Sequence, residues 1–434
     1  MVGIFLSAAI VITAHAVKSV PAACKKEMNA WCNSQTSCVQ LMQKDGFKLP
    51  LVALNDYGSK GEAAGKSWRC YSPSVLSPNR SLYIGGKAYC SRPELAAALS
   101  LCSNPKVYIN ATLLFTEAEV AECGFIRTPQ PILTASGKIL LFAQCRDTQG
   151  LQPTKISKKP LRDDFRHCRM VLKTSVDFGI TWSPMRFVSE EGTGVGVAIF
   201  DRVHNATVFQ YQTMPFEDPY RSNTLWQKIS ADEGRTWSTP LNISSQIHAV
   251  CNSDKLDEMV CGAAGSRIQT AAGRLVFSGH NKRQVCVWYS DDGGKTYSTS
   301  AKVFTGDEQS IAQLSDGSLY MNGRGRPEPW RPNRTAWRSF DGGHTWSSPR
   351  PTPIQGVDCE AAVIAVPPIT SQGETDTNST LILSQPAGPG RVSFSLYCSC
   401  DNGVTWPHSL TVNPGSAAAY SGLLQVRHGP NPKR

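Results

Sequence analysis

The chain has 434 residues, 41% of them hydrophobic, which is enough for one large domain or two to three smaller ones. Its formal net charge is +10, but the 44 lysines and arginines are scattered and form no basic run. A nucleic-acid-binding protein is expected to gather its positive charge on one face or helix, so the sequence argues against that class of partner.

The N-terminal segment, residues 1–16, has the pattern of a secretory signal peptide. An apolar run from Val2 to Ala14 leads into Ala14-His15-Ala16, a small-x-small arrangement that is typical of a cleavage site. The run is shorter than the roughly 20 residues that span a bilayer, and no longer apolar stretch follows. An uncleaved anchor is the alternative interpretation. We therefore expect a secreted or surface-held protein without a transmembrane helix.

The cysteine count and the glycosylation signals also favour an exported protein. The chain has 15 cysteines, many for a reducing compartment, and six Asn-x-Ser/Thr sequons. Six of the cysteines precede residue 103, and their spacing does not match a metal-binding pattern such as paired Cys-x-x-Cys. Residues 17–119 are therefore expected to form a small cysteine-rich N-terminal module held by disulfides. The sequons are at Asn79, Asn110, Asn205, Asn242, Asn333 and Asn378.

From residue 120 to residue 434 the sequence predicts an all-β domain. Short alternating runs bounded by Gly, Asp, Asn or Pro are typical of strands of about four to eight residues, and an extended helical period is almost absent. These runs are KILLFAQC, RMVLKTS, TVFQYQ, RLVFSG, VCVWYS, SLYMNG, TLILSQ and VSFSLYCS.

One motif, Ser-x-Asp-x-Gly-x-Thr-aromatic, recurs five times in this domain. The five boxes begin at Ser175, Ser230, Ser290, Ser339 and Ser399. Successive boxes therefore start about 50 to 60 residues apart, a period that is typical of β-propeller blades. In each box we expect the Asp to accept hydrogen bonds from turn N–H groups and the Gly to adopt a positive φ. The boxes are therefore expected to be scaffold and not catalytic machinery.

The five boxes resemble the Asp-box (BNR) repeats of the sialidase superfamily, whose fold is a six-bladed β-propeller. The resemblance covers roughly residues 120 to 425. It implies a six-bladed, sialidase-like propeller over residues 120–434, preceded by the cysteine-rich module.

The first site residues of that family have counterparts around the first box. The family's Arg in a Phe/Tyr-Arg-Ile-Pro motif corresponds to Arg127 in FIRTPQP, and the Arg that ends the following strand corresponds to Arg146. The family's acid lies shortly before the first box, at a distance that selects Asp164 or its neighbour Asp163. Asp164 is the preferred assignment, and Asp163 stays open.

The remaining site residues follow in the family's order. Glu308 in GDEQSIAQ is followed, at the family's spacing, by Arg324 in LYMNGR. Arg391 lies shortly before the box that begins at Ser399, and Tyr420 lies in AAAYSG after that last box.

The resemblance implies an exo-α-sialidase that acts with retention. Sialic acid carries a carboxylate on its anomeric carbon, and guanidinium groups bind such an anion through charge-assisted hydrogen bonds. A carboxylate nucleophile would be repelled by that group, whereas the phenol of Tyr420, deprotonated by Glu308, would not. Asp164 would protonate the leaving oxygen and then activate water. The expected partners are sialylated glycoconjugates, with no cofactor and no metal.

The C-terminal region departs from the family pattern. Family members continue past the Tyr with further strands and a Glu that braces the first Arg, and this sequence has no Glu after Tyr420. Either the chain is truncated, or residues 103–120 help to close the last blade. In the second case Glu117, Glu119 or Glu122 would brace Arg127.

Three other functions are compatible with parts of the sequence. A trans-sialidase would share every site residue named above. A catalytically inactive sialic-acid-binding lectin or adhesin would keep the arginines and lose turnover. A propeller that serves only as an interaction module is disfavoured by the placed arginines.

Overall fold

The structure is a computed structural model of the chain. The residues that it describes are 8–15, 51–55, 83–84, 87–88, 106–146, 168–189, 193–213, 224–251, 260–261, 265, 267–280, 284–300, 304–325, 333–366 and 379–426. Most of the expected N-terminal module, residues 17–119, lies outside these ranges, as do Asp163 and Asp164.

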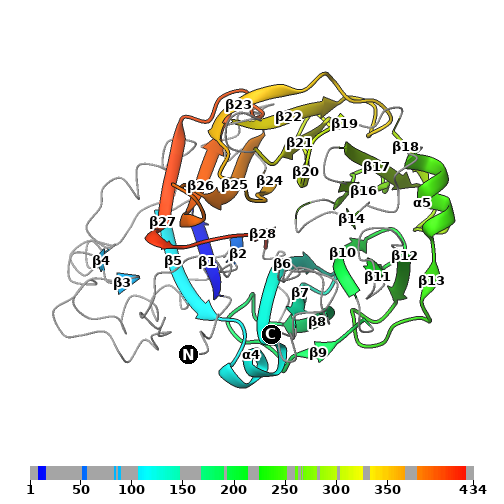
Figure 1. Cartoon of the computed structure of the whole chain (residues 1–434), viewed down its shortest axis with the longest axis horizontal. Coiled ribbons are helices and arrows are strands. Elements are labelled where there is room, and N and C mark those ends of the chain that lie inside the picture. Colours follow the sequence, from blue (N-terminus) through cyan, green and yellow to red (C-terminus); the bar gives the residue numbers. More distant parts are fainter. Residues whose placement is uncertain are drawn as a thin grey trace, which may run out of the picture.

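The domain is an all-β propeller in which antiparallel sheets are arranged around a common centre (Figure 1). Five blades are built from strands that are consecutive in sequence, and all eight strand runs expected from the sequence lie in these blades.

The first blade contains β6 (Phe125–Leu133), β7 (Ile139–Arg146), β8 (Cys168–Ser175) and β9 (Arg186–Phe187), and the second β10 (Thr193–Asp201), β11 (Ala206–Thr213), β12 (Thr224–Ser230) and β13 (Leu241–Asn242). The third contains β14 (Val260–Cys261), β15 (Arg267–Gln269), β16 (Leu275–His280), β17 (Gln284–Ser290), β18 (Ser298–Thr299) and β19 (Phe304–Thr305). The fourth contains β20 (Gln309–Gln313), β21 (Leu319–Gly323), β22 (Asn333–Ser339) and β23 (Arg350–Gln355), and the fifth β24 (Ala362–Val366), β25 (Thr380–Pro386), β26 (Val392–Ser399) and β27 (His408–Ala417).

Six blades were expected, but the structure has five blades whose strands are consecutive in sequence. A further four-stranded sheet, here called the terminal sheet, combines both ends of the described chain in the order β28-β2-β1-β5. Its strands are β28 (Ser421–Gln425), β2 (Leu51–Asn55), β1 (Ala8–His15) and β5 (Lys106–Leu113). β5 falls in the segment expected to help close the propeller, and β1 falls in the expected signal peptide. β28 contacts β6 on one side and β24 on the other (Figure 1).

The remaining elements are small. β3 (Tyr83–Ile84) pairs with β4 (Lys87–Ala88), and the two described helices are α4 (Glu117–Cys123) and α5 (Ser244–Cys251). A disulfide between Cys123 and Cys145 joins α4 to β7. Neither of these helices is long and apolar enough to cross a membrane.

The hydrophobic core lies between neighbouring blades. Side chains alternate along each strand, so one strand supplies apolar groups to two neighbours. In β28, Leu423 packs with the fifth blade, whereas Leu424 packs against the first. Between the first and second blades, Phe142 and Phe209 stack with ring centroids 5.1 Å apart. This packing fixes the inner strand ends that carry the candidate site.

The five boxes form the turns between β8 and β9, β12 and β13, β17 and β18, β22 and β23, and β26 and β27, and their expected scaffold role is confirmed. In every box the Ser hydroxyl donates to the Asp carboxylate and accepts the N–H of the Gly, while the Asp accepts the backbone N–H and hydroxyl of the Thr. The five glycines all have positive φ, between 80° and 94°. These bonds hold the pKa of the Asp341 carboxyl at about 2, against its partial burial.

The glycine of the last box is expected to be intolerant of any side chain. Gly403 has a φ of 81°, and a Cβ placed there would lie 2.6 Å from the Tyr320 ring and 2.8 Å from Leu381. Gly137 has a similar φ of 85°, but no atom lies within 4 Å of such a Cβ. A substitution at Gly137 therefore measures the free-energy cost of the positive φ without any collision. We expect Gly137→Ala to destabilise by about 1 kcal/mol and Gly403→Ala by about 3 kcal/mol, because the second adds a collision. Thermal denaturation of the two variants tests this, and equal losses would contradict it.

Candidate functional site

Glu308 and Arg324 meet at the open end of the β20–β21 hairpin. Glu308 immediately precedes β20, Arg324 immediately follows β21, and the Arg324 N–H donates to the Glu308 carbonyl oxygen over 2.8 Å. Their spacing in the sequence is therefore the length of one hairpin. The side chains also meet, because Nη1 of Arg324 lies 2.6 Å from Oε2 of Glu308.

Tyr420 completes this pair from a distant part of the sequence. It lies between the end of β27 and the start of β28, and its hydroxyl donates to Oε1 of Glu308. Nη1 of Arg324 also donates to the Tyr420 hydroxyl oxygen, over 3.3 Å. Burial and the Glu308 charge raise the pKa of Tyr420 well above its usual value, and the cations of Arg324 and Arg391 oppose that shift.

Two further arginines flank the Tyr420 ring. The guanidinium carbons of Arg127, from β6, and of Arg391, just before β26, lie 5.2 Å and 5.5 Å from the ring centroid. Arg391 is positioned by its carbonyl oxygen, which accepts the Ala418 N–H over 2.9 Å. Three cations at one phenol favour a negatively charged oxygen there, and they favour an anionic ligand beside it.

Arg146 belongs to the same blade as Arg127 but is placed further along it. Gln144 is the cross-strand partner of Arg127, and Nε of Arg146 donates to the side-chain oxygen of Gln144 over 2.7 Å. Since cross-strand partners and residues two apart share a face of a sheet, these three side chains lie on one face. Arg146 is buried, with 5% of its surface exposed. The structure thus brings together five of the seven expected site residues, namely Tyr420 itself with Glu308, Arg324, Arg127 and Arg391. Arg146 is linked to them through Gln144, and Asp164 lies outside the described residues.

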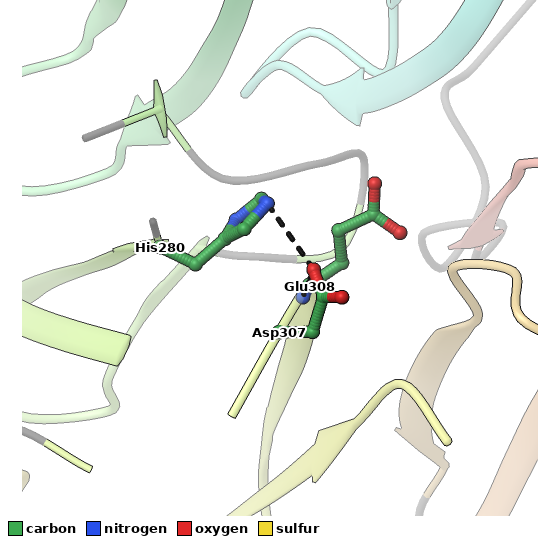
Figure 2. Close-up of side chains that lie close together, drawn as sticks. All are labelled: His280, Asp307 and Glu308. Atoms are coloured by element: carbon green, nitrogen blue, oxygen red, sulfur yellow. Dashed lines mark hydrogen bonds and ion pairs between the residues drawn. The ribbon is translucent and has the colours of Figure 1, made fainter. Parts of the chain in front are cut away.

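His280, Asp307 and Glu308 lie close together (Figure 2), and the nitrogen and oxygen atoms that could bind a metal are all within 4.8 Å of one another. An imidazole and two carboxylates can bind a divalent metal. Here both Glu308 oxygens already accept hydrogen bonds, from Tyr420 and Arg324. The nearby guanidinium groups would also repel a dication, so the cluster does not fit a metal site.

The same cluster instead supports the Glu308 backbone. Oδ1 of Asp307 accepts the Glu308 N–H over 2.9 Å, and Nε2 of His280 lies 3.4 Å from that oxygen (Figure 2). Asp307 is thus placed to fix the start of β20.

Two acids in this region were not found by sequence reasoning. Oδ1 of Asp358 accepts hydrogen bonds from Nε and Nη2 of Arg324, over 3.1 Å and 2.7 Å. Glu360 lies two residues on, is fully buried, and accepts the N–H groups of Gly265 (3.1 Å) and Ser421 (3.4 Å). Their only sequence signal is an acid pair around Cys359 in a segment without a strand pattern.

Glu117, Glu119 or Glu122 was expected to pair with Arg127, but the structure gives Glu119 other partners. The carboxylate of Glu119 accepts two hydrogen bonds from Lys173, over 2.9 Å and 2.7 Å, as well as the Met185 N–H. Glu119 therefore binds Lys173 and not Arg127. Glu117 and Glu122 are exposed on α4.

Glu360 should make the stability of the protein fall as the pH rises. Its burial, followed by the charge of Glu308, raises its pKa from 4.5 to about 8, although its two backbone partners and Arg334 oppose the shift. Because the folded-state pKa is the higher one, the stabilisation is complete below pH 4.5 and is lost as the pH rises through about 8.

We therefore expect Glu360→Gln to flatten the dependence of Tm on pH between 5 and 9, by ~5 °C relative to the parent chain. Glu233→Gln is the matched control, because the hydrogen bonds of Glu233 hold its pKa at about 2 against its partial burial. The stabilisation from Glu233 is present above pH 4.5 and is lost only as the pH falls through about 2, so its replacement should lower Tm by a constant amount between pH 5 and 9 and leave the slope of the curve unchanged. A Glu360→Gln curve parallel to that of the parent would contradict the prediction. Differential scanning calorimetry across the pH range provides the measurement.

The comparisons with known proteins agree on one family. The family model of the BNR repeat-like domain matches residues 197–431, more than half of the chain. A sialidase of Micromonospora viridifaciens is 28% identical over 389 residues, which cover 78% of this chain and 55% of that protein. A sialidase of Bacteroides fragilis is 27% identical over 300 residues, covering 60% of this chain and 52% of its own length. The chain spans about half the length of these two relatives.

Solved structures with the same fold include two at low sequence identity. A Hadza microbial sialidase is 18% identical, with a TM-score of 0.55 over 95% of this chain and 87% of that one. An intramolecular trans-sialidase from Ruminococcus gnavus, solved with oseltamivir carboxylate, is 17% identical, with a TM-score of 0.54 over 73% of this chain and 92% of its own. The matches in sequence and fold together show that the chain belongs to the BNR repeat-like family and to the sialidase superfamily.

Proposed function

We propose that the protein is a retaining exo-α-sialidase that releases terminal sialic acid from glycoproteins, glycolipids or oligosaccharides, with Tyr420 as its nucleophile. One observation carries the proposal. The Tyr420 hydroxyl is bonded to the Glu308 carboxylate and to Arg324, while Arg127 and Arg391 flank its ring. This arrangement joins a neutral nucleophile, a base and an anion-binding site.

The chemistry follows from the contacts of Tyr420. The three arginines bind the carboxylate of the sugar. Glu308 takes the phenolic proton as the Tyr420 oxygen bonds to the anomeric carbon, and the bond to the leaving oxygen breaks as Asp164 protonates that oxygen. The Asp164 carboxylate then takes a proton from water, whose oxygen attacks the anomeric carbon. The phenolic oxygen leaves and recovers its proton from Glu308. Two displacements at one carbon give net retention.

The terminal sheet lies between the first and fifth blades and would close the ring. Its inner strand β28 contacts β6 and β24, and the other inner strands contact one another in the order β6, β10, β15, β20 and β24. Residues 106–113 contribute β5 to that sheet, which supports the expectation that residues 103–120 help to close the last blade. Tyr420 lies directly before β28, so this closure would also hold the nucleophile in place.

An extracellular location fits the same proposal. The disulfide between Cys123 and Cys145 is of a kind that persists in oxidising compartments, and the six sequons and the apolar N-terminal run agree with export. Mass spectrometry of protein secreted by a eukaryotic host would test this by showing the N-terminal residue and the glycosylated sequons.

Incubating the full chain with a fluorogenic α-sialoside and following the sugar by NMR tests the proposed activity. Release of N-acetylneuraminic acid, first as the α-anomer, is the expected result. Transfer of the sugar to an added acceptor would instead indicate a trans-sialidase, and an intramolecular product would match the activity named for the Ruminococcus gnavus protein. Binding without release would indicate a lectin. The absence of both would reject the proposal.

A further inference from the structure

Asp358 is hydrogen-bonded to Arg324, which is one of the three arginines that bind the substrate carboxylate in the proposed function. Every nitrogen of the Arg324 guanidinium already donates a hydrogen bond. Nε and Nη2 donate to Oδ1 of Asp358, and Nη1 donates to Glu308 and Tyr420. A guanidinium grips a carboxylate best with two parallel N–H groups on one edge. A substrate carboxylate can therefore take a two-point grip on Arg324 only if one of these internal partners moves.

Asp358 is the partner that can move. Its side chain is 47% exposed, whereas those of Glu308 and Arg324 are 8% and 11% exposed. Glu308 is further restrained by Tyr420 and by the bond from its N–H to Asp307. Breaking the contact of an exposed carboxylate is cheap, because water replaces the lost partner.

The backbone at Asp358 is held in an unusual conformation by a second arginine of the site. Its φ is 52°, in the left-handed region that non-glycine residues seldom adopt, and its carbonyl oxygen accepts a hydrogen bond from Nη2 of Arg391 over 3.0 Å. Two of the arginines proposed to bind substrate thus contact this one residue. The contact with Arg391 keeps the backbone in place while the side chain is able to leave Arg324.

We propose that Asp358 is an internal anion that neutralises Arg324 until a substrate carboxylate displaces it, so that this residue sets the affinity of the site for anionic sugars. The inference rests on the proposed function, since it assigns the displacing group to the carboxylate of a sialoside. Asp358 touches no reacting atom in this scheme and is a specificity-determining residue.

Asp358→Asn is the decisive variant. It removes the charge, keeps the size, and keeps a residue type that tolerates the left-handed backbone. The probe is 2-deoxy-2,3-didehydro-N-acetylneuraminic acid, a planar and unhydrolysable analogue, and its methyl ester is the uncharged control. The matched protein control is Asp291→Asn, since Asp291 is also an exposed partner of a more buried arginine, Arg274, but lies in the third box.

Isothermal titration calorimetry should show that Asp358→Asn binds the acid about tenfold more tightly than the parent, with little change for the methyl ester. Asp291→Asn should bind both as the parent does. The fluorogenic sialoside should show the same gain as a lower KM. Circular dichroism and Tm would show whether the variant is folded.

Equal or weaker binding of the acid by Asp358→Asn would overturn this inference alone, and it would mean that Asp358 orients Arg324 for the ligand. A similar gain for the methyl ester would also overturn it, because the effect would not depend on charge. If neither the parent nor the variant binds the acid, the proposed function and this inference both fall. Binding by the variant alone would support the inference.

Discussion

Tyr420→Phe is expected to lower kcat on an α-sialoside by ~10³-fold or more, while the protein stays folded and continues to bind the sugar. The substitution removes only the hydroxyl oxygen, which is the atom that bonds to the anomeric carbon. Arg127 and Arg391 flank the ring, which the substitution keeps, so these anion-binding arginines should keep their places. Binding should therefore change much less than kcat.

Tyr289→Phe is the control for loss of a buried phenol. Its hydroxyl lies 2.8 Å from Nδ1 of His344 in the fourth box, remote from the candidate site along the sheet. We expect that variant to retain kcat. Steady-state kinetics with both variants would contradict the assignment of Tyr420 if its substitution reduced kcat by less than about tenfold.

Glu308→Gln is expected to lower kcat by roughly 10²- to 10⁴-fold, the range that general-base groups usually contribute. The amide oxygen can still accept a hydrogen bond from Tyr420, but it cannot take the phenolic proton. The change also removes the carboxylate that pairs with Nη1 of Arg324 over 2.6 Å, so a smaller rise in KM is expected. The change should lower kcat more than it raises KM, because the negative charge of Glu308 is needed in the step in which Tyr420 loses its phenolic proton.

Glu233→Gln is the matched control for this second variant. The Glu233 carboxylate bonds to Ser136 and Lys138 in an outer turn, and its loss should leave kcat unchanged. Stopped assays at a fixed pH measure both variants. A Glu308→Gln enzyme with nearly normal kcat would mean that another group deprotonates Tyr420.

The features that could be predicted from the sequence are those encoded locally. The five boxes specify their own turns through Ser, Asp, Gly and Thr, so their structure follows from a few adjacent residues. The spacing of Glu308 and Arg324 is likewise local, because it is the length of one hairpin. The convergence of Arg127, Arg391 and Tyr420 came from the family resemblance, and the propeller explains it by placing the inner strand ends of different blades around one centre.

The features that could not be predicted depend on distant parts of the chain. In the terminal sheet β28 pairs with the strand at residues 51–55, which pairs in turn with the strand at residues 8–15, and strand pairing at such separations has no local signal. Asp358 and Glu360 lie in a segment that carries no periodic pattern, and their importance comes from Arg324 and Ser421, which other elements supply. Asp164 stays a prediction.

Covalent trapping tests the central claim most directly. A 2,3-difluoro sialic acid carries fluoride as the leaving group, and its second fluorine slows both displacements by destabilising the positively charged transition state. Peptide mapping by mass spectrometry after this treatment should place one sialyl adduct on Tyr420, and Tyr420→Phe should carry none. An adduct on Glu308, or turnover of sialosides by Tyr420→Phe at the parent rate, would contradict the account.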